Sequence, residues 1–208
     1  KDDIDYFLKN TDKMEIKNDI FKAIDSKKDH LKTISRLFSS LDPLTAKRLS
    51  RKKKFNVYSN IQNNLEFFLS QFKKNNISNE VILDNTLEYY GREEDFFIIY
   101  SNLIENSIYW LKTVEKINKK IKISAYLENE KLIIEYKDNG PGINEKFANE
   151  IFDAGFSTKP EGGTGIGLTL TGQAVSRNNG SIECIKSTEG VYFKITFNGD
   201  NNDQTTNN

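Results

Sequence analysis

The feature that most constrains the fold is a predicted strand that ends in an aspartate and a turn, followed downstream by the glycine-rich run of residues 162–168. Residues 131–137 form an apolar, β-branched segment typical of a strand, and Asp138 stands at its end, before two turn dipeptides in residues 139–142. Residues 162–168 carry four glycines and precede a segment that predicts a helix. Glycines that open a helix leave backbone N–H groups free, and such groups hold phosphates.

The composition favours a globular protein without a global charge bias. Thirty basic and thirty acidic side chains cancel, so nothing draws the whole chain towards nucleic acid or an anionic membrane. The single cysteine, Cys184, excludes an intramolecular disulfide, and its strand-like surroundings favour a buried, inert thiol. No segment approaches the roughly 20 apolar residues of a membrane span, and the N-terminal residues show no signal-peptide pattern. We therefore expect a cytoplasmic location, as the cytoplasmic portion of a longer protein.

The ends of the chain differ in character from its centre. Residues 1–42 place apolar side chains at helical spacing, which predicts a long helix that serves as a dimerisation or stalk segment, because one narrow stripe cannot bury itself. Residues 43–54 are basic and without interleaved aromatic residues, so a solvated linker is favoured over a nucleic-acid or lipid patch. Residues 199–208 are polar, which predicts a disordered tail.

Residues 55–198 predict one α+β domain. Helical periodicity alternates with paired, strand-like segments, and this order is typical of a two-layer α/β sandwich with helices on one face of a mixed sheet. We expect helices over 58–72, 96–111 and 168–175 and strands over 55–57, 81–83, 121–127, 132–137, 181–187 and 191–197.

Two further motifs accompany the glycine-containing turns and give them a family context. Asn106 lies on the strongly apolar helix upstream, and residues 152–159, with Phe152 and Lys159 at their ends, lie between the two turns. In this order the four motifs resemble the N, G1, F and G2 boxes of the GHKL ATP-binding superfamily. Within it, the sequence is most similar to the catalytic ATP-binding domain of bacterial sensor histidine kinases. The resemblance implies a Bergerat-type fold that binds ATP with Mg²⁺.

The resemblance also implies roles for individual residues. Asn106 would be the Mg²⁺ ligand, Asp138 would accept a hydrogen bond from the adenine amine, and Gly142 would let the base approach. Residues 153–166 would form a lid that is mobile without nucleotide. The complete set of expected nucleotide-binding residues is Asn106, Asp138, Gly140, Gly142, Ile143, Phe156, Gly163, Thr164, Gly165, Ile166, Gly167 and Leu168.

Three residues are candidates for catalytic roles: Asn102, Glu105 and Lys159. In the hydrolase branches of the superfamily a glutamate stands four residues before the metal-binding asparagine, where this chain has Asn102. An amide cannot take a proton as a carboxylate does, so we expect slow intrinsic hydrolysis. Glu105 lies about 100° round the helix from Asn106 and needs a different geometry to substitute. Lys159 is either a phosphate contact or an exposed loop lysine.

The leading hypothesis is a histidine-kinase-like phosphotransferase that forms a homodimer through its N-terminal helix and engages a response regulator. The sole histidine, His30, lacks the His-Glu pair and the nearby proline of a phosphoacceptor. We therefore interpret His30 as a solvated helix-face histidine, with a phosphoacceptor as the alternative. An acceptor is expected in upstream sequence, or it is missing altogether. The alternative function is an ATP-gated interaction module that phosphorylates no protein.

Overall fold

The structure is a computed structural model that describes residues 51–160 and 163–199. The predicted N-terminal helix over 1–42, His30, most of the predicted linker, Gly162 of the glycine-rich run and the tail from residue 200 lie outside the described residues. The helices and strands are β1 (Lys53–Asn56), α3 (Val57–Phe67), α4 (Leu69–Asn75), β2 (Ile77–Ile82), β3 (Glu88–Gly91), α5 (Glu93–Lys112), β4 (Lys119–Glu128), β5 (Lys131–Asp138), the 3-10 helix η2 (Glu145–Phe147), α6 (Gly167–Arg177), β6 (Gly180–Cys184) and β7 (Tyr192–Phe197).

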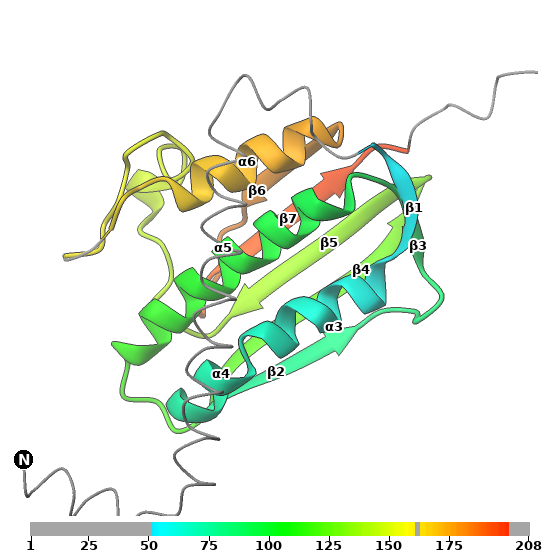
Figure 1. Cartoon of the computed structure of the whole chain (residues 1–208). Helices are drawn as coiled ribbons and strands as arrows, with labels where there is room; N and C mark the ends of the chain where they lie inside the picture. The colour runs from blue at the N-terminus through cyan, green and yellow to red at the C-terminus, as the bar shows by residue number, and fades with distance from the viewer. Residues whose placement is uncertain (1–50, 161–162, 200–208) are drawn as a thin grey trace, which may run out of the picture. The chain divides into compact units, whose positions relative to one another are not determined.

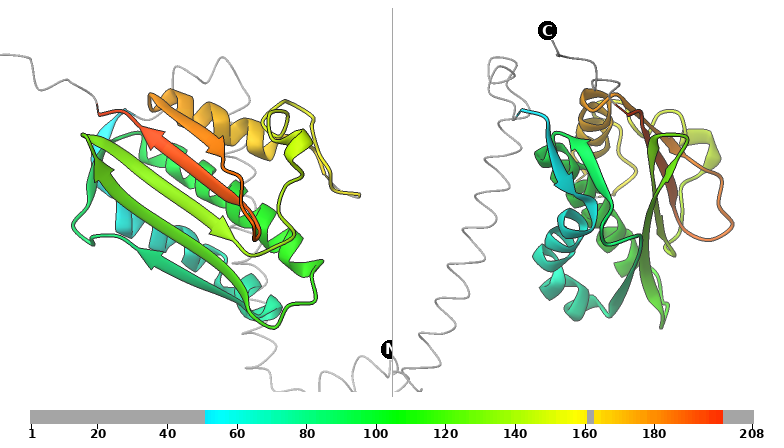
Figure 2. Two further views of the ribbon diagram at one scale, coloured as in Figure 1. Left: turned by 180° about the vertical axis from the view of Figure 1, so that it is seen from behind. Right: turned by 90° about the vertical axis from the view of Figure 1, so that its right-hand side faces the viewer.

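The main sheet has five strands in the order β2-β4-β5-β7-β6. Strand β2 runs parallel to β4, and the other neighbouring strands are antiparallel. Helices α3, α5 and α6 lie side by side over one face of this sheet (Figures 1 and 2). The predicted two-layer α/β sandwich with a mixed sheet is therefore confirmed.

Helix α5 is the central helix of the helical layer (Figure 1). Its first turn carries three acidic residues and its last turn carries Lys112, an arrangement that complements the helix dipole. Its buried side includes Phe96, Ile99, Leu103 and Ile108, each at most 2% exposed. This apolar face fixes the rotation of α5 against the sheet, and with it the direction in which Asn102 and Asn106 point.

Strand β5 supplies the opposite wall of the core. Leu132, Ile134, Tyr136 and Asp138 alternate along the strand and are all buried. Because successive side chains of a strand point to opposite faces, these four share the face that packs on the helices. The strand therefore places a carboxylate at the end of an otherwise apolar or aromatic row.

A buried ion pair joins the N-terminal turn of α5 to the last turn of α6. Asp95, whose side chain is 3% exposed, accepts two hydrogen bonds from Arg177 Nε, at 3.1 and 3.2 Å, and forms an ion pair with Arg177 Nη2 at 2.5 Å. Asn178 Nδ2 donates to the same carboxylate at 2.9 Å. These contacts hold the two helices in a fixed relative position at the end away from the glycine-rich run.

The structure differs from the expected elements in several places. The single helix expected over 58–72 is broken at Phe68, whose φ of −96° and ψ of 3° leave the helical region while its side chain is fully buried. Val57 begins α3 rather than ending a strand, and β2 ends before Leu83. Strand β3, which pairs antiparallel with β1, was not expected.

The first strand overlaps the range predicted as linker. Strand β1 begins at Lys53 and includes Lys54, both within the range predicted as linker.

None of the helices in the described part of the chain combines the length and the hydropathy that crossing a bilayer requires.

Candidate functional site

The helix α5 and the start of α6 meet at Asn102. Asn102 is 8% exposed, and its Nδ2 atom donates to the backbone oxygen of Ile98 at 2.9 Å. A Cβ atom placed on Gly167 would lie 3.0 Å from Asn102 Oδ1. The predicted catalytic position and the last glycine of the glycine-rich run therefore lie in contact, although they are far apart in the sequence.

One turn further along α5, Asn106 meets a cation from the loop before α6. Lys159 Nζ donates to Asn106 Oδ1 at 2.8 Å and lies 4.6 Å from the centroid of the Tyr109 ring. Burial lowers the pKa of Lys159, and the negative charge of the exposed Glu105 opposes this shift. Lys159, which belongs to the motif between the two turns, therefore lies close to Asn106 and Tyr109 of α5.

At the end of β5, the carboxylate of Asp138 accepts hydrogen bonds from three donors. The backbone N–H groups of Gly140 and Val191 donate to Oδ1, at 2.9 and 3.2 Å. Ser107 Oγ donates to Oδ2 at 2.5 Å, and Tyr136 OH donates to Ser107 Oγ at 2.9 Å. Asp138 is 7% exposed, so these donors compensate the burial of its charge.

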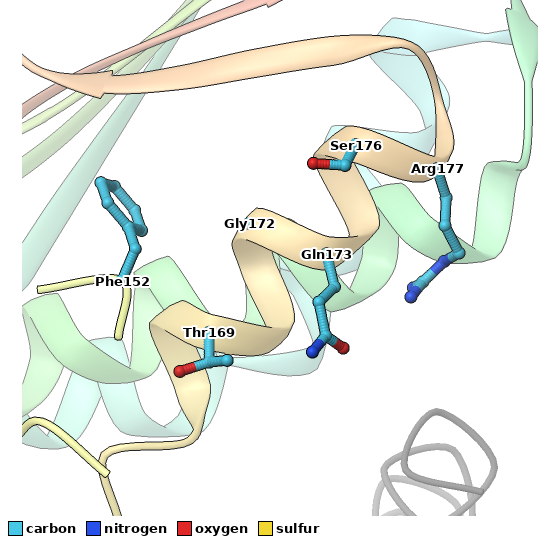
Figure 3. Close-up of a pocket in the computed structure, with 6 residues that line it drawn as sticks. All are labelled: Phe152, Thr169, Gly172, Gln173, Ser176 and Arg177. Carbon is cyan, nitrogen blue, oxygen red and sulfur yellow. The ribbon is translucent and has the colours of Figure 1, made fainter. Parts of the chain in front are cut away.

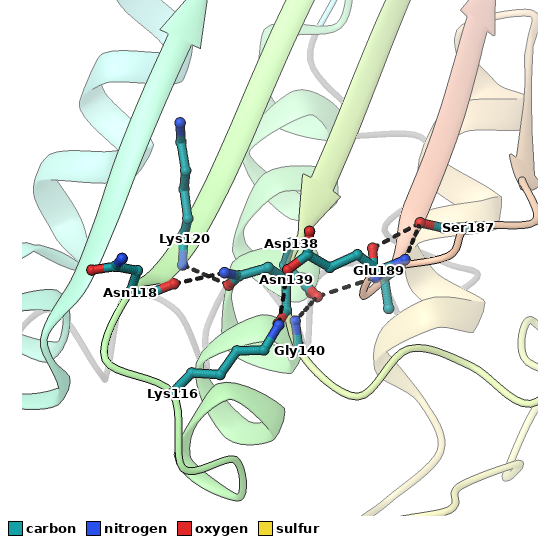
Figure 4. A network of polar contacts seen from close by, with 9 residues as sticks. Lys116, Asn118, Lys120, Asp138, Asn139, Gly140, Ser187 and Glu189 are labelled. Carbon is teal, nitrogen blue, oxygen red and sulfur yellow. Dashed lines mark hydrogen bonds and ion pairs between the residues drawn. The ribbon is translucent and has the colours of Figure 1, made fainter.

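The turn that follows Asp138 is fixed by Asn139 (Figure 4). Its Oδ1 atom accepts from the backbone N–H of Lys120 at 2.8 Å, and its Nδ2 atom donates to the backbone oxygen of Asn118 at 2.6 Å. Lys116 Nζ donates to the backbone oxygen of Asn139 at 3.0 Å and pairs with Glu189 at 2.9 Å. The start of β4 and the β6–β7 loop therefore hold the turn from two sides.

Two glycines allow loops to approach the site closely. Gly190 has a φ of +64°, and a Cβ atom there would lie 1.9 Å from the backbone oxygen of Asp138. Gly165 has a φ of +66°, and a Cβ atom there would lie 2.2 Å from the backbone carbon of Gly155. A side chain at either position would separate segments that now touch, because L-residues disfavour this φ and no space is left for the added atom.

The remaining predicted residues lie in the loops between β5 and α6, except Leu168, which lies in the first turn of α6. Phe156 packs against Phe147 with ring centroids 5.3 Å apart, while Phe152 packs against Phe193 of β7 at 6.0 Å. Ile143 and Leu168 are half-buried, whereas Gly163, Thr164 and Ile166 are exposed. The Thr164 hydroxyl accepts a local hydrogen bond from the N–H of Ile166 at 3.4 Å.

The structure thus gathers the predicted residues into two neighbouring groups. One contains Asn102, Asn106, Lys159 and Gly167, and the other contains Asp138, Gly140 and the turn at Gly142. Helix α5 joins the two groups, because Ser107 follows Asn106 directly and bonds Asp138. Gly163, Thr164 and Glu105 are exposed at the margin of this arrangement.

Three residues outside the predicted site take part in the hydrogen-bond network around Asp138: Ser107, Tyr136 and Val191. Two of them carry a signal in hindsight. Ser107 adjoins the metal-ligand candidate Asn106, and Tyr136 lies two residues before Asp138, on the same face of β5. Val191 carries no signal of its own, since it contributes only its backbone N–H.

The donor set around Asn106 fits Mg²⁺. The amide oxygen is half-buried and accepts a hydrogen bond from a cationic nitrogen, so the position is already suited to positive charge. Among the described residues there is no cluster of three or more His, Cys, Asp or Glu side chains able to hold a metal. A single amide oxygen suits Mg²⁺, which keeps several waters and takes other ligands from phosphate groups.

A separate pocket of about 480 Å³ lies beside α6 (Figure 3). Its lining residues are Phe152, Thr169, Gly172, Gln173, Ser176 and Arg177. None of the expected nucleotide-binding residues is among them. The pocket is therefore separate from the predicted nucleotide-binding residues.

A helix-covered mixed sheet, with an asparagine of α5 and an aspartate at the end of its central strand near a glycine-rich helix start, defines the class as a GHKL-type ATP-binding domain. Sequence comparison agrees with this class. The profile of the histidine kinase-, DNA gyrase B- and HSP90-like ATPase family matches residues 91–201, more than half of the 208 residues. The chain belongs to this family.

The relatives it matches are sensor kinases. A probable C4-dicarboxylate sensor kinase of Bacillus subtilis is 35% identical over 106 residues, which are 50% of this chain and 20% of that protein. The signal transduction histidine-protein kinase ArlS of Staphylococcus aureus is 38% identical over 112 residues, which are 50% of this chain and 23% of that protein. The matched region thus spans about a fifth of the length of these relatives.

Solved structures of histidine kinases share the fold. The catalytic domain of histidine kinase ThkA, in a nucleotide-free form, has a TM-score of 0.63 and 24% identity over 72% of this chain and 96% of that one. ThkA in complex with the response regulator TrrA has a TM-score of 0.62 and 21% identity over 84% of this chain and 50% of that one. At these identities the likeness concerns the fold alone.

Proposed function

We propose that the chain binds Mg-ATP between Asn106 and Asp138 and transfers its γ-phosphate to a histidine. The observation that carries the proposal is the contact between Lys159 Nζ and Asn106 Oδ1 at 2.8 Å, on the same helix that bonds Asp138 through Ser107. One helix therefore connects a position suited to a cation and phosphate with a buried carboxylate suited to an amine. An adenine nucleotide carries complementary groups at its two ends.

The residues take complementary roles in this proposal. Asp138 accepts a hydrogen bond from the adenine amine, while Gly140, Gly142, Ile143 and Phe156 border the base. The backbone N–H groups of Gly163, Thr164, Gly165, Ile166, Gly167 and Leu168 surround the phosphates, as N–H groups at a helix start do for anions. Asn106 holds Mg²⁺, which, when bound, neutralises charge on the phosphate oxygens.

The residues near the γ-phosphate favour positioning over hydrolysis. Asn102 presents an amide where a general base would be needed, and its Nδ2 atom already bonds Ile98. Lys159, which now contacts Asn106, would contact the phosphates of a bound nucleotide, and Glu105 lies at the margin as a second charged group. The bound nucleotide therefore waits for an acceptor, and the rate depends on how that acceptor is oriented.

The partners in this proposal are a second copy of the chain, joined through the N-terminal segment, and a response regulator. The complex of ThkA with TrrA supports the second partner by analogy of fold. The acceptor histidine belongs to a segment other than the described residues, because those residues include no histidine.

A second candidate function is an ATP-gated interaction module, favoured by the composition of the chain. Its one histidine, His30, lacks the sequence surroundings of an acceptor. Incubation with γ-labelled ATP separates the two functions. Acid-labile, base-stable label on the chain or on a partner histidine supports the kinase, and an Asn106→Ala variant serves as the unlabelled control. Tight ATP binding without any transfer supports the gated module and contradicts the kinase.

A further inference from the structure

The carboxylate of Asp138 has few acceptor positions left for a ligand. An ionised carboxylate offers about four lone-pair positions on its two oxygens. Gly140 and Val191 take the two on Oδ1 with their N–H groups, at 2.9 and 3.2 Å. Ser107 takes one of the two on Oδ2, at 2.5 Å. Within the described part of the chain, one position on Oδ2 remains.

The direction of the hydrogen bonds in this network is fixed. Asp138 has no proton to give when it is ionised, so the Ser107 hydroxyl must donate to it. Tyr136 OH then donates to Ser107 Oγ, at 2.9 Å. Burial, together with the negative charge of Asp138, raises the pKa of Tyr136 well above its ordinary value, so the phenol keeps its proton. The chain of donors therefore runs from Tyr136 through Ser107 to Asp138.

The three residues are held by packing as well as by these bonds. Tyr136 and Asp138 share one face of β5, and Ser107 faces them from α5. Tyr136 is 0% exposed and Ser107 is 2% exposed, so water has little access to compete for the same positions. The remaining acceptor position on Oδ2 is consequently fixed in direction before any ligand arrives.

We propose that Ser107, fixed by Tyr136, is a positioning residue that leaves Asp138 a single acceptor position and so selects a purine with an amino group at carbon 6. This inference rests on the proposed binding of the base at Asp138. A 6-oxo purine presents an oxygen at carbon 6 and an N–H at the neighbouring ring nitrogen. Such a base would place its carbon-6 oxygen against Oδ2, and its one N–H would lie at the neighbouring ring atom, to which the single remaining acceptor position is not directed.

The test compares three nucleotides with the complete chain. Calorimetric titrations in the presence of Mg²⁺ measure the Kd of ATP, of purine riboside triphosphate, which lacks the 6-amino group, and of inosine triphosphate, which carries the 6-oxo group. The wild type should bind ATP about 10- to 100-fold more tightly than purine riboside triphosphate, the range expected for one hydrogen bond to a charged group.

Ser107→Ala should lower this preference by about fivefold or more, because Asp138 Oδ2 is then no longer fixed in direction towards the 6-amino group. Purine riboside triphosphate has no 6-amino group, so its Kd should change by less than about twofold. Tyr136→Phe should act in the same direction with a smaller change, and Ser107→Thr, which keeps the hydroxyl, should restore part of the preference. Inosine triphosphate should gain relative to ATP in Ser107→Ala, since Oδ2 then has two open positions.

Two variants control for the loss of a buried hydroxyl. Ser101→Ala removes a hydroxyl of α5 that bonds Ile98 instead of Asp138. Tyr100→Phe removes a fully buried phenol oxygen that has no hydrogen-bond partner among the described residues. Both should leave the ratio of the two Kd values unchanged.

The inference would be overturned if the ratio of the Kd values of ATP and purine riboside triphosphate were unchanged in both Ser107→Ala and Tyr136→Phe. This includes the case in which both ligands bind more weakly by the same factor. If Ser107→Ala does not fold, the ratio measured for Tyr136→Phe decides alone. Failure of the proposed function looks different: the wild type would bind no ATP, or Asp138→Asn would leave the Kd of ATP unchanged.

Discussion

Lys159 Nζ lies 2.8 Å from Asn106 Oδ1, so the loop before α6 already provides a cation for the helix amide. In the proposed complex, Mg²⁺ would need the oxygen that this ammonium group now occupies, and the phosphates would offer the lysine a new partner. The contact would then link the loop to nucleotide binding through one pair of atoms.

Replacing this lysine should weaken binding through the phosphates. Lys159→Met removes a charged hydrogen bond worth about 1.5–3 kcal/mol, so ATP should bind roughly 10- to 100-fold more weakly, while adenosine changes little. Titration calorimetry with both ligands checks this. Lys146→Met, at an exposed lysine that lies over the Phe147 ring, is the matched control. Equal losses for ATP and adenosine would mean that Lys159 supports the fold rather than the phosphates.

The amide of Asn106 should account for the effect of Mg²⁺. In the wild type we expect ATP to bind more tightly with Mg²⁺ than with EDTA, because Asn106 would hold a metal ion that neutralises charge on the phosphates. In Asn106→Ala the two Kd values should converge. Asn79→Ala, at an exposed position of β2, is the control. A full Mg²⁺ effect in Asn106→Ala would place the metal elsewhere.

Asp138→Asn is nearly isosteric, so it should keep the fold while placing an amide N–H₂ group near the adenine amine. We expect the affinity for ATP to fall by about 10- to 100-fold, the loss of one charge-assisted hydrogen bond. Equilibrium binding measures the change, with Asp153→Asn, an exposed loop residue, as control. Unchanged affinity would remove Asp138 from the site.

The Asp95–Arg177 pair should dominate the electrostatic contribution to stability. Arg177→Met leaves the 3% exposed Asp95 with Asn178 as its remaining partner from α6. Removing one member of a buried pair costs about 3–5 kcal/mol, so the free energy of unfolding should fall by about that amount in urea titrations. Lys186→Met, which breaks an exposed pair with Glu145, should change it by less than about 1 kcal/mol.

Tyr192 should make the fold sensitive to alkaline pH. Burial, and the hydrogen bond it donates to Glu135 Oε1 at 2.8 Å, raise the pKa of Tyr192 from 10.0 to about 12. In that interval the folded state binds more protons than the unfolded state, so stability falls as pH rises from 10.0 to about 12. Urea unfolding across this range should show a shallower fall for Tyr192→Phe. Parallel curves would contradict the assignment.

The elements that the sequence predicted best are those with the clearest periodicity. The apolar spacing of α5 and the alternation along β5 depend on which face is buried, and both are visible in the chain itself. The break at Phe68 was not predictable in this way, because its side chain continues the buried stripe formed by Leu65 and Phe72. Strand β3 offers only four residues, and it depends on pairing with β1 for its existence.

The site shows the same division. Asn106 and Asp138 stand out because their residue types and spacing match ordered motifs. Ser107 and Val191 act on Asp138 only after α5 and β7 have packed beside β5, and a backbone N–H has no sequence signature. The roles assigned to the motif residues stay predictions until nucleotide binding is measured.

The bond from Val191 N–H to Asp138 also sets the order in which the protein becomes competent. Val191 directly precedes β7, near the carboxyl end of the described chain, whereas all four motifs are complete by Leu168. A ribosome that has released every motif has not yet released this donor, and Gly190, which closes over the Asp138 backbone, arrives with it. The proposed adenine acceptor is therefore completed only late in synthesis, so a truncated product that stops after α6 would contain all four motifs and lack the Val191 donor to Asp138.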